Sequence, residues 1–211
     1  MCHEKEAKEF NRSEHGRIFV PSKNKEGQAC ETCHGPGSIH AEAEGKAGKM
    51  KTIINPGKDP EACYKCHLDK KAEFNLQYHH PVPEGRMTCT DCHDPHGEYG
   101  IKPGTRKSVR GKNELCFNCH KDKAGPFVYE HEAMREGCST CHNVHGSIND
   151  KMVKERDTSL CLKCHFQTNF TPSGGIGNNA HSATRFQEMP CFTNGCHTAV
   201  HGSNYNDHLR V

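Results

Sequence analysis

The sequence predicts a fold of short α-helices and long coils with almost no β-sheet, wrapped around a core that side chains alone do not fill. Only 32% of the 211 residues are hydrophobic and the mean hydropathy is −0.91, which is too polar for an ordinary protein core. The chain nevertheless contains 15 Cys and 18 His, which disordered segments do not accumulate. A non-protein group must therefore fill the interior.

Four short stretches favour helix, and Gly, Pro, Asn and Lys between them are typical of loops. In chain order, the stretches are Lys5–Phe10, Glu61–Lys71, Lys112–Lys121 and Thr158–Cys164. Each of the last three contains a Cys pair, so we expect the short helices to carry these pairs.

A His directly follows the second Cys of every Cys pair. Six pairs have the form Cys-x-x-Cys-His, and a seventh has four intervening residues. Disulfide frameworks and zinc ribbons also use Cys pairs, but neither needs a His at the next position. The spacing is the attachment signal of c-type haem, in which two thiols bind one porphyrin and the adjacent imidazole lies under the iron.

The predicted haem thioether residues are Cys2, Cys30, Cys33, Cys63, Cys66, Cys89, Cys92, Cys116, Cys119, Cys138, Cys141, Cys161, Cys164, Cys191 and Cys196. The predicted proximal iron ligands are His3, His34, His67, His93, His120, His142, His165 and His197.

A unit of two haem motifs and two further histidines repeats along the chain. Residues 63–97 and 116–146 share the order Cys-x-x-Cys-His, Phe, His, Glu-Gly, then Cys-x-x-Cys-His-x-x-His-Gly, and looser copies lie on either side. The repeat predicts one elongated domain built of four two-haem modules, at residues 1–55, 56–105, 106–155 and 156–211. We call these modules 1 to 4.

Cys2-His3 has three interpretations. The repeat favours the end of a motif whose first Cys lies upstream of Met1, which predicts eight haem c groups. A haem held by one thioether is the second interpretation. A stray Cys near a chain end, with seven haems, is the third.

Two imidazoles for each of eight haems need 16 of the 18 histidines. With ligands on both faces no iron has an open position, and the six Met residues are not needed as ligands. In Cys-x-x-Cys-His-x-x-His the second His is too close to reach the far face of its own haem, so we expect it to ligate a neighbouring one. His208 is expected to be a surface or hydrogen-bonded residue. The candidate distal ligands are His15, His40, either His79 or His80, His96, His131, His145, His181 and His201.

The charges and the hydropathy pattern argue against nucleic-acid binding and against a transmembrane helix. The 28 basic and 26 acidic residues nearly cancel, and no stretch approaches 18 apolar residues, so neither nucleic-acid binding nor a transmembrane helix is expected. Covalent haem attachment of this kind takes place outside the cytoplasmic membrane. We therefore expect an exported protein, periplasmic or associated with the outer membrane, whose signal peptide is not in this chain.

Several linker motifs are more specific than the haem attachment signal. Residues 79–85 (HHPVPEG), 94–97 (DPHG), 125–131 (GPFVYEH), 144–147 (VHGS) and 200–204 (VHGSN) resemble the periplasmic decahaem cytochromes of the MtrA/DmsE type, over nearly the whole chain. The resemblance implies bis-His haems in an insulated wire. Such a wire enters an outer-membrane β-barrel porin and exchanges electrons with other multihaem cytochromes.

Two departures from that family are visible: seven or eight haem motifs instead of ten, and one widened Cys pair. They indicate a shorter octahaem relative or a decahaem protein without its N-terminal part.

The leading functional interpretation is electron transfer through a porin–cytochrome conduit by a protein that is not an enzyme. One alternative is a multihaem reductase of nitrogen or sulfur oxyanions, which needs an open iron and often a Cys-x-x-Cys-Lys motif that this sequence lacks. The other alternative is a subunit of an extracellular cytochrome filament, in which His208 or the unused member of His79 and His80 ligates a haem of the next subunit.

Overall fold

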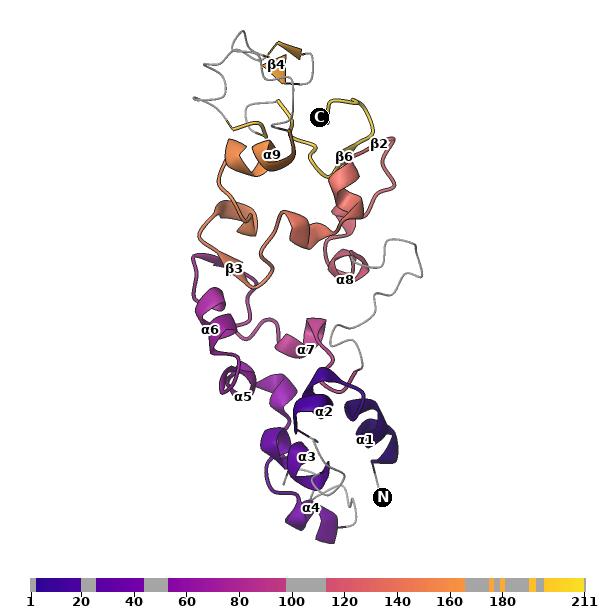
Figure 1. The fold of residues 1–211 in the computed structure, drawn as a ribbon, viewed down its shortest axis with the longest axis vertical. Helices are drawn as coiled ribbons and strands as arrows, with labels where there is room; N and C mark the ends of the chain where they lie inside the picture. The colour runs from indigo at the N-terminus through magenta and orange to yellow at the C-terminus, as the bar shows by residue number, and fades with distance from the viewer. Residues whose placement is uncertain are drawn as a thin grey trace. The chain divides into compact units, whose positions relative to one another are not determined.

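The computed structural model describes residues 3–19, 26–43, 53–97, 113–165, 175–176, 179–180, 190–192 and 196–210. These residues form short helices joined by coil, with strands of two residues each (Figure 1). The α-helices are α1 (Glu4–Phe10), α2 (Glu14–Phe19), α3 (Glu26–His34), α4 (Ser38–Glu42), α5 (Pro60–Tyr64), α6 (Leu68–Phe74), α7 (Cys89–Cys92), α8 (Glu114–Phe117) and α9 (Thr158–His165). The 3-10 helices are η3 (Pro56–Lys58), η4 (Lys121–Lys123), η5 (Glu132–Arg135), η6 (Cys138–Thr140) and η7 (Asp150–Met152). The strands are β1 (Tyr78–His79), β2 (Tyr129–Glu130), β3 (Gly146–Ser147), β4 (Gly175–Ile176), β5 (Asn179–Ala180) and β6 (Gly202–Ser203).

The predicted fold class is confirmed, but two of the four predicted helices are broken. The first and last are present as α1 and α9, whereas Glu61–Lys71 divides into α5 and α6, and Lys112–Lys121 divides into α8 and η4. Both breaks lie at a motif histidine whose backbone leaves the helical region, His67 (φ −94°, ψ 58°) and His120 (φ −89°, ψ 58°). Lys112 itself lies outside the described residues.

The chain divides into two compact units. The first contains Met1–Asn75 and His80–Pro103, and the second contains Leu76–His79 and Gly104–Val211. The division into four modules stays a prediction.

The aliphatic and aromatic core of the first unit is small. Tyr64 and Phe74, from α5 and α6, pack with Val82, and all three are buried. The ammonium group of Lys71 lies 5.6 Å from the centre of the Tyr64 ring, a cation–π contact. A cluster of this size supplies little of the burial that a domain needs, in agreement with the low hydrophobic content of the chain.

Two strand pairs in the second unit have the same form. β1 pairs antiparallel with β3, and β2 pairs antiparallel with β6. Gly202 in β6 has φ +142°, and a Cβ there would collide with the ring of Phe127. A glycine is therefore required where β6 passes the phenylalanine.

Within the described ranges, no helix is both long enough and apolar enough to cross a membrane.

Candidate haem sites

A hydrogen bond joins five motif histidines to the first cysteine of their motif. The N–H of His67 donates to the carbonyl of Cys63 at 3.1 Å. In the widened motif, the N–H of His197 likewise donates to the carbonyl of Cys191, at 2.9 Å. The same bond joins His93 to Cys89, His120 to Cys116 and His142 to Cys138.

His3 has the backbone conformation of the histidines that open modules 2 and 3. His3, His67 and His120 each directly precede a helix, with φ between −120° and −89° and ψ between 50° and 58°. Cys2 lies outside the described residues. His3 thus shares its local backbone with His67 and His120, and the presence of a haem site there stays a prediction.

The first cysteines of two successive motifs are hydrogen-bonded to each other within a module. These pairs are Cys63 with Cys89, Cys116 with Cys138, and Cys161 with Cys191. The hydrogen bond lowers the pKa of one thiol of each pair to about 7 and raises that of its partner, because the partner stabilises the thiolate. The lowered thiols are Cys89, Cys116 and Cys191.

Second cysteines approach one another from one module to the next. Burial and the neighbouring thiol of Cys66 raise the pKa of Cys33 in the first unit. Burial and the neighbouring thiol of Cys164 raise the pKa of Cys141 in the second unit. Within each unit, thiols of successive motifs are thus also neighbours in space.

Pairs of histidine rings lie at the separation that a shared metal ion requires. Two imidazoles that bind one metal ion from opposite sides, each with a bond of about 2 Å, have ring centres about 6 Å apart. Five described pairs have centres 5.8–6.1 Å apart, and each joins a predicted proximal ligand to a predicted distal one. The pairs are His3 with His40, His67 with His15, His34 with His96, His165 with His131 and His142 with His201.

Four of these ring pairs join different modules. In the first unit, His15 of module 1 lies against His67 of module 2, and His96 of module 2 lies against His34 of module 1. The second unit repeats this exchange, with His131 of module 3 against His165 and His201 of module 4 against His142. Sequence analysis placed His96 next to a neighbouring site, but it did not find this reciprocal exchange.

Backbone carbonyls fix the orientation of the rings. The Nδ1–H group of His34 donates to Ile54 O at 3.0 Å, and that of His142 donates to Lys151 O at 2.8 Å. The Nδ1–H group of His131 donates to Val200 O at 2.9 Å. With Nδ1 protonated, the lone pair of Nε2 is available for a metal, the usual arrangement around a ligating histidine.

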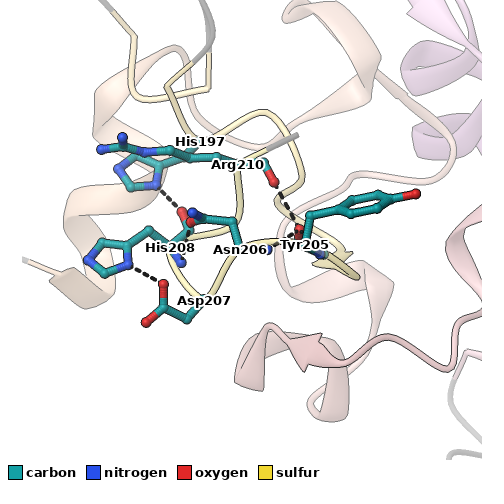
Figure 2. A network of polar contacts seen from close by, with 7 residues as sticks. His197, Tyr205, Asn206, Asp207, His208 and Arg210 are labelled. Carbon is teal, nitrogen blue, oxygen red and sulfur yellow. Dashed lines mark hydrogen bonds and ion pairs between the residues drawn. The ribbon is translucent and has the colours of Figure 1, made fainter.

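The C-terminal loop builds such a carbonyl acceptor for His197 (Figure 2). The Nδ1–H group of His197 donates to the carbonyl of His208 at 2.5 Å, and Asn206 Oδ1 accepts from the His208 N–H at 2.8 Å. The His208 side chain itself is exposed and bonds to Asp207 at 2.6 Å. His208 is therefore a surface residue whose carbonyl, not its imidazole, faces the site.

Partial desolvation lowers the pKa of two of the paired rings. Desolvation, followed by the nearby charge of Lys123, lowers the pKa of His201 to about 4. Desolvation also lowers the pKa of His165. Neutral imidazole is the form that binds a metal, so both rings are available as ligands at physiological pH.

Apolar side chains beside the histidines fit a flat hydrophobic cofactor. Leu68 follows His67 and is 66% exposed, and Ile39 precedes His40 and is 58% exposed. A porphyrin bound at the adjacent imidazole would cover side chains in these places. The donor set and its surroundings thus fit haem.

The remaining predicted ligands stand as follows. His181, like Cys2, lies outside the described residues. The ligand roles of all the predicted histidines, including His79, His80, His93, His120, His145 and His197, stay predictions, as do the thioether roles of the cysteines.

Asn113 is a residue near these sites that sequence analysis missed. It is 2% exposed, and its Oδ1 accepts from the Cys138 backbone N–H at 2.7 Å and from the Cys138 thiol at 3.1 Å. Its Nδ2 donates to Met134 O at 2.5 Å. Asn113 lies three residues before Cys116, so it ties the two motifs of one module together, and no sequence pattern marks it.

Known proteins share both the motif and the overall sequence. A family model described as a doubled CXXCH motif matches residues 79–125 and 131–170. A protein named multiheme cytochrome MtrA, from Shewanella baltica strain OS185, is 31% identical over an alignment of 262 positions. The alignment covers 97% of this chain and 77% of that relative.

Proposed function

Since the chain belongs to the family of MtrA-type multihaem c-type cytochromes and is thus an electron-transfer protein with bound haem c, we propose that it carries electrons across the outer membrane. Its haems form a wire between the periplasm and the cell exterior. The partners are an outer-membrane β-barrel porin, which encloses the wire, and other multihaem cytochromes at its ends.

The histidine ring pairs are the observation that carries this proposal. Each pair would supply two imidazoles to one iron, so that a haem held by His34 and His96, for example, would have no position for a substrate. When bound, haem c supplies a one-electron iron couple. The paired thiols would hold it, and Nδ1–H bonds to backbone carbonyls orient imidazoles such as those of His34, His131 and His142.

The thiol contacts support a path that follows the sequence. Each thiol would hold one edge of a haem, so contacting thiols bring two attachment points together. In the second unit the contacts run from Cys116 to Cys138, then from Cys141 to Cys164, and from Cys161 to Cys191. Electrons would pass through the motifs of this unit in sequence order.

We propose eight haems, one for each motif histidine. The helix-preceding conformation of His3 and its 6.0 Å ring pair with His40 support a site at Cys2-His3. The intact mass of the native holoprotein, compared with its apoprotein mass, tests this number. Eight haems agree with the proposal, and seven contradict it.

The polar surface suits a water-filled barrel. The mean hydropathy of −0.91 and the near balance of 28 basic and 26 acidic residues favour a hydrated enclosure over lipid contact. An exported location follows from the same assembly, since the wire must reach the porin from the periplasmic side.

Electron transfer across a vesicle membrane tests the conduit directly. The holoprotein and its cognate porin are reconstituted into liposomes that contain a membrane-impermeant oxidant, and a reductant is added outside. Oxidation of the haems and consumption of the trapped oxidant are expected only with both proteins present. A protein that never copurifies with the porin, or that conducts no better than empty porin, contradicts the proposal.

The oxidised spectrum separates the conduit from a reductase. A protein with two imidazoles on every iron shows only low-spin haem. High-spin haem in the native protein would indicate an open iron and would favour substrate reduction.

A further inference from the structure

Two strand pairs of the second unit have the same register relative to a Gly-Ser dipeptide. In the first, Tyr78 lies opposite Ser147 and His79 opposite Gly146. In the second, Tyr129 lies opposite Ser203 and Glu130 opposite Gly202. The register makes Tyr78 equivalent to Tyr129 and His79 equivalent to Glu130. The next residue of each segment is a histidine, so His80 is equivalent to His131.

His131, the equivalent of His80, has a ring partner. Its ring centre lies 6.1 Å from that of His165, and its Nδ1–H group donates to Val200 O. His15 in module 1 repeats this geometry, with a ring centre 6.0 Å from that of His67 and its Nδ1 3.4 Å from Pro95 O. Val200 and Pro95 each directly precede a paired distal histidine of the following module.

His79 has a different environment. Its Nδ1–H group donates at 2.6 Å to Leu76 O, three residues earlier, whereas His131 bonds a carbonyl of the following module. The bond to Leu76 leaves Nε2 available as well, so the strand register, and not this bond, separates the two histidines. Successive side chains of a strand point to opposite faces, so a shift of one residue moves a ring to the other side. His79 therefore projects on the face that Glu130 occupies, and His80 projects on the face of His131.

We infer that His80, and not His79, is the axial haem ligand contributed by this segment. The inference rests on the proposed bis-His wire and makes it more specific, because the sequence alone leaves both histidines open. His79 occupies a position at which the equivalent copy has a glutamate, a residue that is not an axial ligand in this arrangement.

A matched pair of variants of the full holoprotein tests the assignment. His80→Ala and His79→Ala are expressed with complete haem attachment, which intact mass verifies for each. Low-temperature electron paramagnetic resonance of the oxidised proteins then reports the spin state, with and without added imidazole. His80→Ala is expected to convert one haem from low spin to high spin, and imidazole should restore it, whereas His79→Ala should keep all haems low-spin.

A second pair of variants, with methionine in place of alanine, controls for local rearrangement in the alanine variants. His80→Met supplies a thioether and is expected to shift one haem to a higher reduction potential while leaving it low-spin, with a sulfur-to-iron charge-transfer band. His79→Met should show neither change. The inference is overturned if the spin-state change accompanies His79→Ala, if both alanine variants show it, or if neither does.

The test separates this assignment from the proposed function. High-spin haem in the unsubstituted protein would defeat the fully bis-His wire. If the unsubstituted protein contains only low-spin haem, a difference between His80→Ala and His79→Ala shows only which of the two histidines is the ligand.

Discussion

Replacing Asn113 with alanine should destabilise the second unit although the residue is no predicted ligand. Asn113 is fully buried, and its side chain bonds the Cys138 N–H at 2.7 Å and the Met134 carbonyl at 2.5 Å. The Cys138 thiol is consumed by haem attachment, so these two backbone bonds are the ones that the holoprotein retains. The substitution leaves both backbone groups without this partner in a site that water reaches poorly.

The expected loss follows from these two groups. An unsatisfied buried backbone group costs about 1–3 kcal/mol, and partial relaxation into the gap reduces the sum. We expect Asn113→Ala to lower the free energy of unfolding by about 2–4 kcal/mol. At about 2–4 °C per kcal/mol for a chain of this size, the melting temperature should fall by about 5–15 °C.

Thermal unfolding of the holoprotein, followed by far-ultraviolet circular dichroism, measures this loss, and intact mass confirms that the variant carries every haem. Asn75→Ala is the matched control, because Asn75 is exposed at the end of α6 and its truncation should change stability by less than about 0.5 kcal/mol. An Asn113→Ala protein that is fully loaded and melts with the control would refute the reasoning. The two motifs would then be joined by the haems alone.

Three further outcomes are expected. Gly202→Ala should destabilise the protein by about 1–3 kcal/mol in urea unfolding, because its φ of +142° is strained for alanine and Phe127 blocks the Cβ. Gly85→Ala, at φ +70° with no atom in the way, should cost less, about 1 kcal/mol. His96→Ala should give one high-spin haem that imidazole restores, since the ring is 5.8 Å from that of His34, and an unchanged spectrum would exclude His96 as a ligand. Chemical removal of the haems should abolish helical circular dichroism, because binding to the native state alone supplies most of the stability; an apoprotein with native ellipticity would contradict this.

The positions of the motif residues were predictable because the chemistry of attachment fixes their spacing. Two thiols and an imidazole must reach one porphyrin, so Cys63, Cys66 and His67 are recognisable without any fold. The low hydrophobic content likewise predicted coil, short helices and a small side-chain core. The helix breaks were missed because helix propensity continues through the motif, whereas His67 and His120 adopt ψ near +58° to end one helix and begin the next.

The partners of the distal histidines were not predictable from spacing. Only two residues separate His93 from His96, so His96 cannot reach the far face of the haem that His93 binds. This spacing leaves open which neighbouring haem His96 ligates. The answer depends on where the loop of another module passes, which is set by contacts such as the one between His15 and Pro95, 80 residues apart. The choice between His79 and His80 likewise depends on the register of β1 against β3, which the adjacent histidines in the sequence do not reveal.

The reciprocal exchange of rings has a consequence for how each unit holds together. Module 1 gives His15 to the site of His67 and receives His96 at the site of His34, so each of the two modules depends on the other for one ring. Modules 3 and 4 are joined in the same way by His131 and His201. Loss of one distal ring thus weakens the joint between two modules as well as one iron site. Together with the strand pairs β1–β3 and β2–β6 of the second unit, these shared sites join distant parts of the chain, so ligand binding and folding should be cooperative within each unit.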